Sequence, residues 1–98
     1  MPRPRKRRIC GCRFADRAFK PAGTPMSELE VVPLALEELE ALRLCDLEGM
    51  TQEEAGVSMG VSRGTVQRIL SHARKKCAQA LVKGCALVFT ERERRTRR

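Results

Sequence analysis

The stretch TQEEAGVSMGVSRGTVQRIL, residues 51–70, decides the fold because it holds the start and end of one helix and the start of another. Thr51 and Glu54 fit the capping box, in which a hydroxyl and a carboxylate three residues apart satisfy the first amides of a helix. Gly60 can take the left-handed conformation that ends a helix and turns the chain, and Ser62 can cap the next helix. The pattern therefore predicts two helices joined by a tight turn.

Outside this stretch, the sequence predicts one more helix and a long continuation of the last one. Residues 36–47, LEELEALRLCDL, are strong helix formers, and their leucines cover a wide arc, as in a helix packed on more than one side. Gly49 is expected to end that helix. After Ser62 the apolar residues recur at three- and four-residue steps, which predicts a helix to Lys83 with Gly84 as its stop. These positions are Val66, Ile69, Leu70, Ala73, Cys77, Ala80 and Leu81.

The two ends of the chain look different from this helical centre. Residues 1–33 contain all five prolines, which favours an extended basic arm followed by a loop. Residues 90–98 are rich in arginine and are expected to form a disordered basic tail. We therefore predict an all-α fold, in which residues 34–89 form a small helix-turn-helix domain of three main helices.

The outer face of the predicted third helix suggests what the domain binds. With its apolar residues inward, the exposed positions at its N-terminal end are Arg63, Gly64, Gln67 and Arg68, where recognition helices reach base edges. The residues expected near phosphates are Ser62, Thr65, Ser71, His72, Arg74 and Lys75. A merely solvated face would mix both signs of charge, but residues 63–83 contain no Asp or Glu. The pattern favours DNA binding.

Charge is distributed in three blocks along a chain of net charge +8. Residues 1–20 carry eight Lys or Arg and one acid, residues 21–62 nine acids and one Arg, and residues 63–98 eleven Lys or Arg and two acids. Two basic ends are typical of a chain that meets a polyanion. The N-terminal arm is expected to contact DNA phosphates, with insertion into an A·T-rich minor groove as the alternative. Its cations are Arg3, Arg5, Lys6, Arg7 and Arg8.

Composition argues against several other classes of protein. No apolar run is long enough to span a membrane, and no apolar segment follows the charged N-terminus as in a secretory signal, so we expect a cytoplasmic protein. Five cysteines without framework spacing indicate reduced thiols. No catalytic constellation is present, so we expect neither enzymatic activity nor a cofactor. Cys10 and Cys12 leave a metal- or redox-responsive regulator as an alternative.

Four segments resemble a known family: RPRKRRIC (3–10), FKPAGTPMSELE (19–30), LEELEALRLCDLEGMTQEEAG (36–56) and MGVSRGTVQRILSHARKKCAQALVKGCAL (59–87). They are similar, in order and nearly without gaps, to the short prokaryotic proteins called uncharacterised protein family 0251, or domain of unknown function 134. The resemblance implies DNA binding through a helix-turn-helix like region four of bacterial sigma factors. It implies no operator, regulated gene or effector.

We thus expect a prokaryotic transcriptional regulator that binds double-stranded DNA sequence-specifically. The alternative partner is RNA polymerase, contacted by a sigma-like adaptor through the acidic first helix. Homodimerisation also stays open. The apolar run CALVF, residues 85–89, has strand propensity and no evident partner in the sequence. It would either join a second copy, together with the end of the third helix, or fold over the first helix of a monomer.

Overall fold

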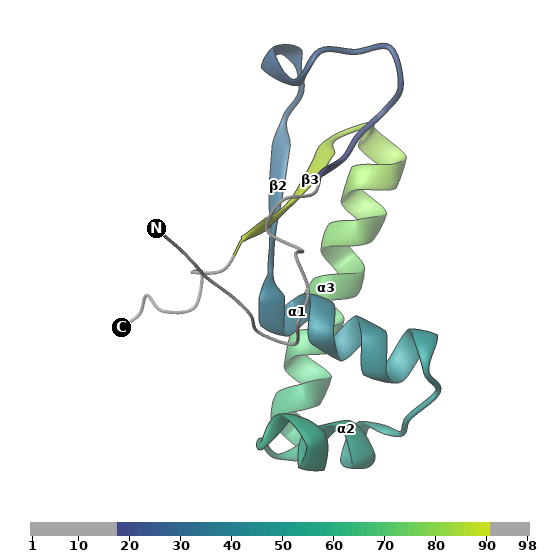
Figure 1. Ribbon diagram of the computed structural model, residues 1–98, viewed down its shortest axis with the longest axis vertical. Coiled ribbons are helices and arrows are strands. Elements are labelled where there is room, and N and C mark those ends of the chain that lie inside the picture. Colours follow the sequence, from purple (N-terminus) through teal and green to yellow (C-terminus); the bar gives the residue numbers. More distant parts are fainter. Residues whose placement is uncertain (1–17, 91–98) are drawn as a thin grey trace, which may run out of the picture.

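A computed structural model describes residues 18–90. Its longest element is a helix that runs the length of the molecule, with a small sheet beside one end and shorter helices around the other (Figure 1). The elements in chain order are β1 (Ala18–Phe19), a 3-10 helix η3 (Met26–Glu28), β2 (Val31–Ala35), α1 (Leu36–Ala41), a π-helix η4 (Leu42–Leu47), α2 (Gln52–Met59), α3 (Arg63–Lys83) and β3 (Ala86–Thr90).

The helix boundaries agree with the capping pattern in the sequence. The Thr51 hydroxyl accepts from the Glu54 amide at 3.0 Å, and the Glu54 carboxylate accepts from the Thr51 amide at 2.9 Å. Gly60 ends α2 with φ of 77°, and Gly84 ends α3 with φ of 72°. The Ser62 hydroxyl caps α3 by accepting from the Thr65 amide at 3.2 Å. The predictions for both helices are confirmed.

The predicted all-α class is wrong, because residues outside the helices form a three-stranded mixed sheet. Strand β3 lies in the centre, antiparallel to β1 and parallel to β2. Parallel strands need a long crossover, and here residues 36–83, with all the long helices, are that crossover. Pro33 falls in the predicted loop, but in the structure it lies in the edge strand β2, where the missing amide costs no ladder hydrogen bond.

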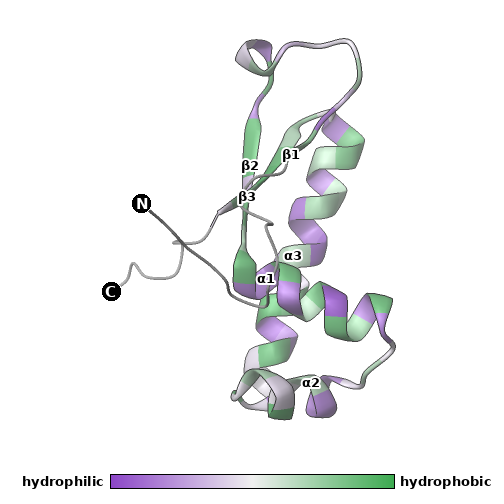
Figure 2. Cartoon of the chain, in the orientation of Figure 1, coloured by the Kyte–Doolittle hydropathy of each residue, from purple (hydrophilic) through white to green (hydrophobic). Residues whose placement is uncertain are grey.

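The sheet packs against the C-terminal half of α3. Strands β2 and β3 are largely hydrophobic (Figure 2). Val32 clusters with Ala80 and Cys85, while Leu34 and Phe89 pack on Ala73. Strand β3, which takes up most of the CALVF segment, therefore has strand partners on both sides within its own chain. Of the two alternatives left open, strand pairing with a second copy is not what the structure shows; the segment folds back within its own chain, onto β1 and β2.

The N-terminal half of α3 has a second apolar cluster, made with α2 and η4. Leu44, Ala55 and Val66 are buried there, and Cys45, Met50 and Met59 pack against them. From the same helical segment, Leu39 and Leu42 pack instead on the cluster beside the sheet. The wide arc of leucines in residues 36–47 thus serves two clusters, as predicted, although the segment changes from α- to π-helix at Leu42.

Gly56 allows the close approach of α2 to the turn. A Cβ at this position would lie 2.7 Å from the Val61 carbonyl oxygen, which belongs to the backbone and cannot easily move. A Cβ on Gly64, in the first turn of α3, would have no neighbour closer than the Ser62 hydroxyl oxygen at 4.0 Å. The two glycines therefore have opposite roles, although each carries the same intrinsic cost in a helix.

We expect Gly56→Ala to lower the free energy of unfolding by about 1–3 kcal/mol, because overpacking outweighs the better helix propensity. Gly64→Ala, its matched control, is expected to raise that free energy by up to about 1 kcal/mol. Urea denaturation of both variants and the parent chain measures the difference. Equal stabilisation by the two substitutions would contradict the close approach.

Candidate nucleic-acid interface

The N-terminal half of α3 presents one buried and one exposed face. Val66, Leu70 and Ala73 point inward and are buried. All four residues predicted to read bases, Arg63, Gly64, Gln67 and Arg68, are exposed. Ser71, His72 and Lys75 continue the exposed face toward the middle of the helix. The structure therefore brings most of the site residues predicted on the third helix onto a single surface, which we call the α3 face.

The first turn of α3 holds two hydroxyl groups in a defined position. The Ser62 and Thr65 side-chain oxygens lie 3.0 Å apart, and Ser62 also caps the helix. Arg68 Nη2 lies 3.4 Å from the Thr65 hydroxyl, a contact that holds the guanidinium beside the first turn. Hydroxyls and amides at a helix start are suited to an anion. The arrangement fits the phosphate contacts predicted for Ser62 and Thr65.

The cations of the α3 face are not neutralised by nearby acids. Among residues 18–90, no carboxylate forms an ion pair with Arg63, Arg68 or Lys75. Arg74 is the one predicted site residue within 18–90 that forms an ion pair: its guanidinium binds Asp46 through two hydrogen bonds, of 2.7 and 3.1 Å. Arg74 thus fastens η4 to α3, and its predicted contact with phosphate would require that pair to open.

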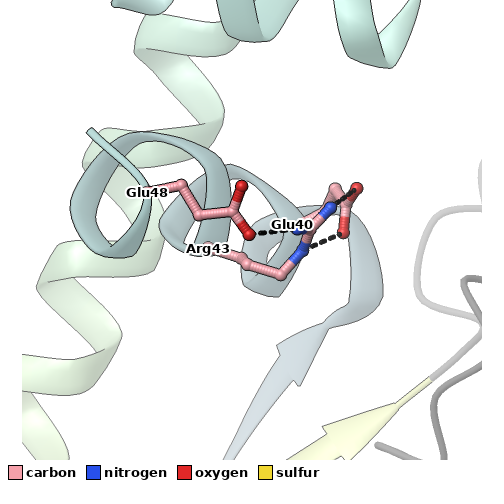
Figure 3. Close-up of polar contacts among 3 residues, drawn as sticks. All are labelled: Glu40, Arg43 and Glu48. Atoms are coloured by element: carbon pink, nitrogen blue, oxygen red, sulfur yellow. Dashed lines mark hydrogen bonds and ion pairs between the residues drawn. The ribbon is translucent and has the colours of Figure 1, made fainter. Parts of the chain in front are cut away.

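The acidic residues of α1 and η4 are mostly satisfied within the chain. Arg43 lies between Glu40 and Glu48, with N–O distances of 2.9 and 2.6 Å (Figure 3). Its hydrogen bonds and charge interaction with Glu40, with a further contribution from Glu48, raise the pKa of Arg43 above its usual range. Glu38 pairs with Lys76 at 2.7 Å. Sequence reasoning missed these pairings, including that of Asp46.

The described thiols are poorly suited to redox or metal chemistry. Burial is the main cause that raises the pKa of Cys45, Cys77 and Cys85, so each stays protonated near neutral pH. No cluster of three His, Cys, Asp or Glu side chains with metal-binding geometry occurs in residues 18–90. Cys10, Cys12 and the predicted arm contacts at Arg3, Arg5, Lys6, Arg7 and Arg8 lie outside the described residues.

The Asp46–Arg74 pair predicts a pH-dependent contribution to stability. The hydrogen bond from Arg74 is the main cause that lowers the pKa of Asp46. A depressed folded-state pKa gives stabilisation that is complete above the unfolded pKa of about 3.9 and is lost as the pH falls through the folded value. We therefore expect the urea midpoint to drop more between neutral and strongly acidic pH in the parent chain than in Asp46→Asn. Equal drops would show that the pair does not stabilise the fold.

Comparison with known proteins places the chain in a family. The profile described as "Protein of unknown function DUF134" matches residues 1–97, and the chain belongs to this family. A UPF0251 protein of Aeromonas salmonicida is 57% identical over 90 residues, which cover 91% of this chain and 87% of that protein. A UPF0251 protein of Vibrio parahaemolyticus, VPA0321, is 52% identical over 94 residues, 95% of this chain and 97% of that protein.

No solved structure matches the chain significantly. Within residues 18–90, no helix is long and apolar enough to cross a membrane. The expected family is thus confirmed, and the function that the resemblance implies stays a prediction.

Proposed function

We propose that this protein binds double-stranded DNA sequence-specifically, with α2 and α3 as a helix-turn-helix and α3 as the recognition helix. The observation that carries the proposal is the α3 face itself. Exposed Arg63, Gln67 and Arg68 occupy consecutive turns, and no acid of the described residues forms an ion pair with Arg63 or Arg68. The major groove is wide enough to admit an α-helix.

The chemistry of these side chains suits base edges. Arginine can donate two hydrogen bonds to guanine O6 and N7, and glutamine can bind adenine N6 and N7 in the same bidentate manner. Gly64 is exposed and has no side chain, so the backbone of the first turn can come close to the groove wall. Recognition helices of this kind contact bases mainly through their N-terminal residues.

Groups at the edges of the α3 face are suited to the DNA backbone. The Ser62 and Thr65 hydroxyls lie together at the start of the helix, and Lys75 is exposed three turns further along. Such contacts fix the register of a protein on the duplex and carry no sequence information directly. They divide the proposed interface into base-reading and positioning groups, and this division can be tested by mutation.

The alternative of an adaptor that binds RNA polymerase through the acidic first helix has weaker support. Of the acidic residues in that helical segment, Glu38, Glu40, Asp46 and Glu48 are held by cations of the same chain. Only Glu37 in α1 and η4 has no ion-pair partner among the described residues, so little unpaired acidic surface is left there for a basic partner.

Selection of bound fragments from random duplex DNA with the full chain tests the proposal. We expect an enriched sequence motif whose conserved positions include guanines. The matched control is the double variant R63A/R68A, which keeps the fold because both side chains are exposed and is expected to enrich no motif. If the parent chain binds DNA without enriching a motif, the protein binds polyanions nonspecifically. If it binds no DNA at all, the proposal is wrong.

A further inference from the structure

An apolar surface lies at the opposite end of α3 from the proposed DNA-binding face. The helix exposes Leu81 and Val82, each 84% accessible, next to a groove of about 540 Å³. Phe19, Cys77, Ala80 and Leu87 line the groove, between α3 and the sheet. In Figure 1 this is the end of α3 that lies beside β3, whereas α2 packs near the other end. We call Leu81, Val82 and the groove the C-terminal patch.

The patch combines a protrusion with a recess. Leu81 forms part of the groove wall, and Ala78 and Val82 extend the exposed apolar surface around the helix at the three- and four-residue steps that make side chains neighbours. A two-fold contact joins the same surface of two copies, so that surface must be complementary to itself. A protruding apolar pair next to an apolar groove meets this condition, because each copy can insert its leucine into the other's groove.

The charges at the rim of the patch are also self-complementary. Glu30 and Lys83 are exposed, and neither has an ion-pair partner among residues 18–90. The Cys85 thiol, which lines the groove, lies 3.8 Å from Glu30 Oε1. Lys83 directly precedes Gly84, another residue of the lining, so both charges lie at the edge of the groove. In a two-fold pair, Lys83 of each copy can face Glu30 of the other, which gives two ion pairs without any foreign partner.

We infer that the C-terminal patch binds a second copy of this chain, with Leu81 seated in the partner's groove and Lys83 opposite the partner's Glu30. Strand β3 takes no part in this contact through strand pairing, since it already has two neighbours in its own chain. Because Arg63 lies at the other end of a helix of 21 residues, such a dimer would hold its two α3 faces well apart. Two such faces could contact two half-sites of DNA, and this one consequence rests on the proposed function.

Sedimentation equilibrium of the full chain without DNA, from micromolar to millimolar concentration, tests the dimer. We expect reversible dimerisation, and we expect Leu81→Glu to raise the dissociation constant by roughly ten-fold or more because a charge replaces the buried leucine. Leu47→Glu is the matched control: Leu47 is 78% exposed but lies in η4, away from the groove, so this variant should dimerise like the parent. A parent chain that stays monomeric, or equal effects of the two substitutions, would overturn the inference.

Charge reversal gives a second readout that a folding defect does not reproduce. Glu30→Lys and Lys83→Glu should each weaken the dimer, and the double variant E30K/K83E should restore it, because the ion pairs reform with opposite polarity. Failure of the double variant to recover would show that the two charges do not face each other. A dimer that selects no DNA motif would contradict the proposed function alone, and a monomer that selects an asymmetric motif would contradict the dimer alone.

Discussion

Replacing Glu38 with alanine is expected to lower the free energy of unfolding by about 2–4 kcal/mol, the largest loss that we anticipate for a single polar side chain in this protein. Glu38 is 8% exposed, and its Oε1 accepts from the Ala35 amide at 2.9 Å and from Lys76 Nζ at 2.7 Å. Ala35 is itself buried and has no side-chain acceptor to cap α1. The one carboxylate therefore caps α1 and ties it to α3.

The loss of stability in Glu38→Ala should come from the two groups that lose their acceptor, the Ala35 amide and the Lys76 ammonium. Without the carboxylate, the Ala35 amide has no acceptor in a buried position, and Lys76 loses its anion. The Lys76 side chain is 27% exposed and can turn partly to water, which keeps the expected cost below that of a fully buried pair. Chemical denaturation followed by circular dichroism measures the change, with Glu37→Ala as the control at the exposed neighbouring position.

Two further variants separate the two roles of Glu38. Glu38→Gln keeps an acceptor for the Ala35 amide but loses the charge. Its free energy of unfolding should therefore lie between those of the parent and of the alanine variant. Lys76→Met keeps the cap and leaves the carboxylate unpaired, and it should also destabilise the fold. If Glu38→Ala costs no more than Glu37→Ala, the carboxylate does not join the two helices as the distances imply.

The helices could be predicted from sequence because their boundaries depend on local chemistry. Thr51, Glu54 and Ser62 bond to amides three residues away or fewer, and Gly60 ends α2 through its own φ angle. The residues that start and end these helices can therefore be recognised from a few neighbouring positions in the sequence. The same locality explains why the inward and outward faces of α3 could be assigned from the spacing of apolar residues.

The sheet could not be predicted in this way, because its strands depend on partners far along the chain. Strand β1 has only two residues, and β2 pairs with β3 across the whole helical segment, as in Val32 opposite Leu87. Proline in a sequence disfavours a strand, because it lacks the amide that a central strand needs. At the sheet edge, where β2 lies, the missing amide of Pro33 faces no partner. The sequence showed that residues 85–89 needed a partner but not where it was.

The same limit applies to the candidate site. The exposure of Arg63 and Arg68 follows from helical periodicity, and the structure agrees. The engagement of Arg74 with Asp46, 28 residues away, left no signal in the spacing. Cations on one helix therefore look equivalent in sequence. In the fold, Arg74 and Lys76 pair with acids and join α3 to other helices, whereas Arg63, Arg68 and Lys75 have no ion-pair partner among the described residues. This difference supplies an internal control for the proposed DNA-binding face.

Arg63→Ala and Arg68→Ala are each expected to weaken binding to a preferred DNA site by about 1–3 kcal/mol, with a smaller loss on random duplex. Each side chain is exposed and has no carboxylate partner among the described residues, so truncation should leave the fold intact. A lost bidentate contact to guanine affects only the site that contains that guanine. Fluorescence anisotropy on the two duplexes, at several salt concentrations, measures both the loss and its dependence on sequence.

One lysine variant and one arginine variant of the same helix show the binding changes expected for residues that do not read bases. Lys75→Ala, which removes a proposed phosphate contact, should weaken binding to both duplexes equally and reduce the log–log salt slope by about 0.9. Arg74→Ala should change affinity least, because Asp46 already holds that guanidinium. If Arg63→Ala and Arg68→Ala instead behave like Lys75→Ala, with equal losses on both duplexes, then α3 lies along the phosphates and some other part of the chain must read the sequence.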